Sequence, residues 1–197
     1  MTTMPLLGLL KPFQIWNDTV LQLGRWLSIA AITLMVLAIL VQVFFRYVLN
    51  NALPWPDEAA RFMMLWMTGL MAPMAYRRGG FVAIDMLVEA LPSKIGAALS
   101  FCLLLISGAV LAFAAKIGWG EFTGFGGRFA TASLYVPTAL DFSQWFRVPR
   151  SWMMASLFVG VVLLLIVNIE LILRSLITMT GGGAALKPLV DEDLTVE

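Results

Sequence analysis

Long apolar runs alternate with short polar segments along the chain. The apolar runs cover residues 23–47, 56–77, 94–119 and 151–174. A helix needs about 20 mostly apolar residues to cross a hydrocarbon core of ~30 Å. Each run reaches that length, although the second does so only when its charged first turn is included. The pattern predicts an all-α integral membrane protein with four transmembrane helices, built as a single membrane domain at residues 1–180.

The segments between and after these runs predict structures outside the hydrocarbon core. In residues 81–91, Asp85 and Glu89 lie four positions apart with apolar residues on the opposite side, which is typical of an amphipathic interfacial helix. Residues 119–147 are rich in aromatic side chains, which suits either the headgroup layer or a partner surface. We expect both segments to lie flat on the membrane. The acidic residues 181–197 predict a flexible tail.

Small residues recur at four-residue spacing in the third and fourth runs. The pairs are Gly108 with Ala112 and Ser156 with Gly160. Because lipid provides no strong hydrophobic drive between helices, small residues mark places where helices can approach closely. The contacts could form within this chain or with a partner, and we favour the former because a four-helix bundle must first pack itself.

The composition excludes several function classes. Hydrophobic residues make up 60% of the chain and charged residues 13%, against about 45–50% and 25% in soluble domains. The net charge of +1 and the lack of a basic stripe argue against a nucleic-acid partner. With no histidine and a single cysteine, Cys102, the chain has no His-ligated haem and no cysteine metal cluster. We therefore predict neither an enzyme nor a cofactor-binding protein.

Four charged residues should meet at one membrane face, where the first run ends and the second begins. They are Arg46, Asp57, Glu58 and Arg61. Charges near lipid are best kept paired, so an internal ion-pair network could tie the first two helices together. The same cluster could instead be a docking or inter-subunit site.

The opposite face should carry Arg77 and Arg78, which close the second run. They could contact a partner subunit, or they could act as a positive-inside signal that places both termini in the cytoplasm. Glu170 and Arg174 form an i,i+4 pair where the fourth run ends.

The region from residue 45 to residue 92 resembles the DctQ family, the small membrane subunit of tripartite ATP-independent periplasmic (TRAP) transporters. The resemblance rests on motif order and spacing: Phe45-Arg46-Tyr47-Val48-Leu49-Asn50, Trp55-Pro56-Asp57-Glu58-Ala59-Ala60-Arg61-Phe62, Trp66, Arg77-Arg78-Gly79-Gly80 and Asp85. One departure is Phe81, which stands where the family commonly has histidine. A role that needs a titrating imidazole therefore cannot operate here.

The resemblance implies an accessory role in secondary active transport across the bacterial inner membrane. In such a system a large multi-span subunit moves the solute, driven by a sodium gradient, and a periplasmic solute-binding protein delivers an organic acid. The small subunit packs in membrane lipid against the scaffold of the large subunit and stabilises it. From the residues alone, a membrane anchor or assembly subunit of another complex remains the alternative.

Overall fold

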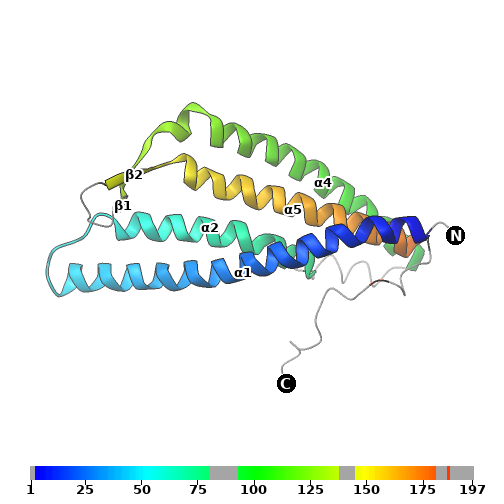
Figure 1. The fold of residues 1–197 in the computed structure, drawn as a ribbon, viewed down its shortest axis with the longest axis horizontal. Coiled ribbons are helices and arrows are strands. Elements are labelled where there is room, and N and C mark those ends of the chain that lie inside the picture. The colour runs from blue at the N-terminus through cyan, green and yellow to red at the C-terminus, as the bar shows by residue number, and fades with distance from the viewer. Residues whose placement is uncertain (1–2, 80–92, 138–144, 181–185, 187–197) are drawn as a thin grey trace, which may run out of the picture.

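Four long helices dominate the computed structural model, which describes residues 3–79, 93–137, 145–180 and 186. The helices are α1 (Thr3–Tyr47), α2 (Pro56–Arg77), α4 (Ser93–Thr123) and α5 (Ser151–Met179). They lie side by side and alternate in direction (Figure 1). Helix α5 contacts each of the other three, and α2 also packs along α1. The arrangement is an antiparallel helical bundle centred on α2 and α5.

Three of these helices are long and apolar enough to cross a membrane: α1, α4 and α5. No residue in the most apolar stretch of α4 is fully buried, whereas a third of the corresponding stretch of α5 is buried. The predicted helical membrane protein is therefore confirmed at this level. Helix α2, which has 22 residues, is not among these three helices, and it carries charged residues at both ends.

Helix α2 has the bounds predicted for the second apolar run, and its ends follow local chemistry. Pro56 occupies the first turn together with Asp57 and Glu58, which suits the positive end of the helix dipole. At the other end the chain passes through Gly79 at a φ of 76°. Glycine adopts this left-handed conformation without a steric cost, so the helix stops there.

Helix α1 begins at Thr3, well before residue 23, where the sequence predicts the membrane span to begin. The additional turns have a buried side: Leu10, Asn17 and Leu21 are at most 3% exposed. In Figure 1 this end of α1 crosses the end of α5. The prediction missed these turns because it followed continuous hydrophobicity, whereas this part of α1 is helical with mixed polar and apolar positions.

The aromatic segment is not helical throughout, so the all-α prediction is wrong at this point. After the short 3-10 helix η1 (Phe125–Arg128), β1 (Ala130–Pro137) pairs with β2 (Trp145–Pro149) in an antiparallel ladder. The register places Tyr135 opposite Arg147, with an irregularity on the β1 side. Because both strands contain β-branched and aromatic residues, the segment suits an extended ladder better than a surface helix. The strands lie at the end of the bundle where α5 begins (Figure 1).

Two predictions concern residues outside the described ranges. The interfacial helix expected at residues 81–91, with Asp85 and Glu89, is one of them. The acidic tail expected at residues 181–197 is the other, since only Leu186 of that stretch is described.

Candidate functional site

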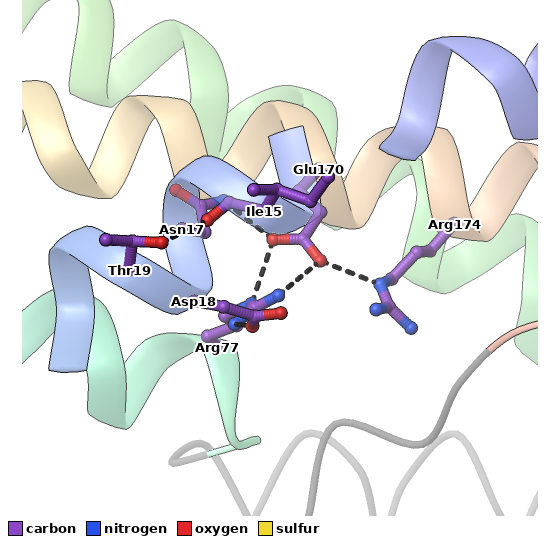
Figure 2. Close-up of polar contacts among 7 residues, drawn as sticks. All are labelled: Ile15, Asn17, Asp18, Thr19, Arg77, Glu170 and Arg174. Carbon is purple, nitrogen blue, oxygen red and sulfur yellow. Dashed lines mark hydrogen bonds and ion pairs between the residues drawn. The ribbon is translucent and has the colours of Figure 1, made fainter. Parts of the chain in front are cut away.

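The most concentrated polar site surrounds Glu170 in α5, whose side chain is fully buried. Its Oε2 accepts hydrogen bonds from Asn17 Nδ2 at 2.6 Å and from Arg77 Nε at 2.8 Å. Its Oε1 accepts from Arg77 Nη2 at 2.9 Å and from Arg174 Nε at 3.0 Å. Figure 2 shows the carboxylate lying between the two guanidinium groups. Both oxygens are thus satisfied by donors from α1, α2 and α5.

Asp18 adds a second carboxylate to this site from α1. Arg77 Nη1 donates to its Oδ1 at 2.5 Å, and the aspartate side chain is 56% exposed. Arg77 therefore joins an exposed partner to a buried one. Two carboxylates and two guanidinium groups balance in charge, which is the arrangement that makes ionised groups tolerable near lipid.

A second set of hydrogen bonds extends the site to α4. Asn168 Nδ2 donates to the hydroxyl oxygen of Tyr76 at 2.6 Å, and that hydroxyl lies 3.2 Å from the hydroxyl of Ser107. Tyr76 and Asn168 are near neighbours in sequence of Arg77 and Glu170. We call the combined set the polar layer; its residues are Asn17, Asp18, Tyr76, Arg77, Ser107, Asn168, Glu170 and Arg174. It joins all four helices near one end of the bundle.

The opposite end of α2 carries a different polar contact, the Glu58 cap, formed by Glu58, Pro54, Ala132 and Ser133. The Glu58 carboxylate accepts from the backbone N–H groups of Ala132 at 2.9 Å and Ser133 at 2.5 Å. The Ser133 hydroxyl lies 2.7 Å from both Glu58 Oε2 and the Pro54 carbonyl oxygen. Strand β1 is thereby attached to the start of α2.

Arg147 completes the strand end of the molecule. Its guanidinium donates to the carbonyl oxygens of Thr131 at 2.5 Å and Ala132 at 2.8 Å, and it lies 5.7 Å from the centroid of the Tyr135 ring. These contacts hold β2 against β1 at the irregular part of the ladder.

The predicted ion-pair network at this end does not form among the described residues. Glu58 binds β1 instead, and Arg46 lies over the ring of its neighbour Tyr47 at 5.8 Å. Asp57 and Arg61 are exposed on the first turns of α2. Backbone N–H groups of an adjacent strand reach the Glu58 carboxylate, so the cationic partners that the sequence suggested are not needed.

Of the predicted arginine pair, only Arg77 enters the polar layer. Arg78 follows α2 and its backbone N–H bonds to the Met74 carbonyl oxygen. The sequence identified the Glu170–Arg174 pair but not Asn17 or Asp18. A signal for them was available in the sequence, since an Asn-Asp pair precedes the first long apolar run.

Three of the predicted small-residue positions, Gly108, Ser156 and Gly160, lie at helix contacts inside this chain, whereas Ala112 is exposed. A Cβ on Gly160 would lie 2.8 Å from Gly69 Cα, and one on Gly69 would lie 2.5 Å from the Ser156 carbonyl oxygen, so α2 and α5 touch backbone to backbone. A Cβ on Gly108 would lie 2.7 Å from Asn168 Oδ1. The contacts of Gly108, Ser156 and Gly160 agree with our preference for packing within this subunit. Gly69 was not foreseen.

The charged groups of the polar layer bind one another and so hold α1, α2 and α5 together. The Glu170 oxygens are occupied by donors of the chain itself, which leaves this carboxylate no free face for a substrate. In the described ranges, no group of three or more His, Cys, Asp or Glu side chains gathers in a way that could hold a metal ion.

Fold and site together define a helical membrane protein whose charged groups fasten its own helices to one another. The family model described as "Tripartite ATP-independent periplasmic transporters, DctQ component" matches residues 35–178. The chain belongs to this family and is a small permease component of a TRAP transporter. No curated protein matches the chain. The match includes Arg77, Glu170 and Arg174 but begins after Asn17 and Asp18.

Proposed function

We propose that this chain is an accessory subunit that packs against the scaffold of the large TRAP membrane subunit and stabilises it. The complex carries out sodium-driven uptake of an organic acid that a periplasmic solute-binding protein delivers. The observation that carries the proposal is the polar layer, because its charged groups serve to fasten helices and leave the bundle with apolar outer faces. A subunit of this kind supports transport and has no solute site of its own.

The outer surface of α4 supports the packing role. Ile106, Val110, Phe113 and Ile117 are each more than 60% exposed. Their spacing of four, three and four residues places them in one stripe, as in a helix–helix seam. Such a stripe suits either lipid tails or a helix of the large subunit.

In this proposal α2 is the fourth transmembrane helix. Its 22 residues correspond to about 33 Å at ~1.5 Å per residue, close to a hydrocarbon core of ~30 Å. The Glu58 cap and the Arg77 contacts then lie at opposite membrane surfaces. The start of α1 and the end of α5 lie on the Arg77 side. We assign this side, and with it both termini, to the cytoplasm of the inner membrane on the positive-inside rule.

Reconstitution tests the accessory role. The purified chain in vesicles with an inward sodium gradient should take up no organic acid, and uptake should appear only with the large subunit and the binding protein. Uptake by the chain alone would refute the proposal. A complex of the large subunit and binding protein that transports equally well without this chain would also refute it.

A further inference from the structure

The N-terminal part of α1, residues 8–26, has a surface organised in three stripes. The first stripe is buried and consists of Leu10, Asn17, Leu21 and Gly24. Their spacing of three, four or seven residues places them on one side of the helix. The Asn17 bond to Glu170 fixes this side against α5. The other sides of the helix are largely exposed, apart from the contact of Asp18 with Arg77 of α2.

The second stripe is apolar and exposed. Leu9, Trp16 and Leu23 follow one another at seven-residue spacing, so they share a side, and their exposed fractions are 57%, 55% and 60%. A helix that ran through water would leave all three side chains hydrated at a considerable cost. Tryptophan in particular favours the boundary between headgroups and hydrocarbon.

The third stripe is basic. Lys11 and Arg25 are exposed and lie fourteen residues apart, close to four helical turns, so they point in similar directions. Asp18 lies midway between them on the same side, but its charge is paired with Arg77. The stripe therefore presents positive charge on the side of the helix nearly opposite the exposed apolar stripe, which is the amphipathic pattern of a helix bound to an anionic membrane surface.

The place of this segment in the fold fits the same membrane surface. The rest of α1, residues 27–47, spans about 31 Å at ~1.5 Å per residue, which already suffices to cross the core. Residues 8–26 are therefore surplus to the span. The bonds of Asn17 and Asp18 hold them at the level of Glu170 and Arg77, near the end of the bundle (Figures 1 and 2).

We propose that residues 8–26, the N-terminal continuation of the spanning part of α1, bind anionic phospholipid at the membrane surface. The Leu9, Trp16 and Leu23 side enters the acyl boundary, and Lys11 and Arg25 contact lipid phosphates. The contact belongs to this chain alone and goes beyond the accessory role, since it needs neither the large subunit nor the binding protein.

Spin labels on the two exposed stripes test the orientation. The full-length chain, with its exposed Cys102 replaced by serine, is placed in nanodiscs of phosphatidylcholine and phosphatidylglycerol without partner subunits. A label at Trp16→Cys should collide mainly with lipid-soluble oxygen, and one at Lys11→Cys mainly with a water-soluble nickel chelate. Equal access of the chelate to both labels would overturn the proposal, because the segment would then project into water or await a protein partner.

Two double variants, one that removes both positive charges and one that keeps them, test the lipid preference. Adding phosphatidylglycerol to phosphatidylcholine nanodiscs should raise the oxygen-to-nickel accessibility ratio at the Trp16→Cys label several-fold. The double variant Lys11→Gln with Arg25→Gln should lose that response, whereas Lys11→Arg with Arg25→Lys should keep it. A response that survives in the glutamine variant would overturn the assignment of these two residues as phosphate contacts. Because no transport is measured, failure here leaves the accessory role standing.

Discussion

The polar layer and the Glu58 cap lie at opposite ends of α2 and fasten the chain in different ways. The polar layer joins side chains to side chains, pairs opposite charges and contains the fully buried Glu170. The Glu58 cap joins one partly exposed carboxylate to backbone N–H groups of a strand. In the first case, removal of Glu170 takes a buried carboxylate away from two guanidinium groups. In the second, removal of Glu58 leaves strand N–H groups that water can reach. The global fold should therefore depend on the first region, and the second should control only local order.

The largest effect is expected at Glu170. Glu170→Gln removes the carboxylate that both Arg77 and Arg174 contact. Breaking a buried ion pair by neutralising one partner costs about 3–5 kcal/mol, so the thermal unfolding midpoint of the purified chain should fall strongly. Asp18→Asn is the matched control, because its pair with Arg77 is half exposed and such pairs contribute about 0–1 kcal/mol. Equal effects of the two variants would contradict a buried clamp.

The next largest effect is expected where α2 and α5 touch. Gly160→Ala places a methyl group 2.8 Å from the Gly69 backbone, which cannot give way as a side chain could. The helices must separate, and overpacking of this kind typically costs about 1–3 kcal/mol. Gly120→Ala is the control, since a Cβ there meets no atom within 4 Å. Circular dichroism melting in detergent should show a loss for Gly160→Ala alone. Unchanged melting of both variants would mean that this contact is loose.

A smaller effect is expected within the uncharged part of the polar layer. Tyr76→Phe removes the hydroxyl shared by Asn168 and Ser107. Hydrogen bonds between membrane helices contribute about 0.6 kcal/mol on average, so the loss should be modest. Gly108→Ala should disturb the same bond by displacing Asn168. In a double-mutant cycle measured by chemical unfolding, the double variant should therefore lose less free energy of unfolding than the two single variants together. Strict additivity of the two losses would show that the two sites are independent.

The smallest global effect is expected at the Glu58 cap. Glu58→Ala removes the acceptor for the Ala132 and Ser133 N–H groups, so hydrogen exchange at these two amides should accelerate. The free energy of unfolding of the helical bundle should change by less than about 1 kcal/mol, as expected for a site that water can reach. Asp57→Ala, one position earlier and exposed, should leave both amides protected. A large loss of bundle stability in Glu58→Ala would show that the Glu58 cap supports the global fold as the polar layer does.

The sequence predicted those features that depend on neighbouring positions. The bounds of α2 followed from Pro56 and the acidic first turn, and the Glu170–Arg174 pair followed from i,i+4 spacing. The contact of Arg77 with Glu170 could not be predicted in this way, because it joins residues 93 positions apart. Its existence depends on how α2 and α5 cross.

The errors have a common physical cause. Hydrophobicity marked where a helix can cross lipid but not where the helix ends, so the part of α1 between Thr3 and residue 23 was not predicted. The strands were missed because aromatic density was interpreted as a sign of the headgroup layer, although the alternation in residues 130–137 also suits a strand. The partners of Glu58 were missed because they include backbone groups of a strand that had not been expected.

The separation of 93 residues between Arg77 and Glu170 also sets the order in which Arg77 meets its two partners during synthesis. At about 5–20 residues per second, the ribosome completes Glu170 roughly 5–20 s after Arg77. Asp18 has already been made when Arg77 emerges, so the guanidinium meets its exposed partner first and its buried partner last. The charge of Arg77 at the end of α2 is thus only partly compensated at first, and the arrival of α5 completes the pairing.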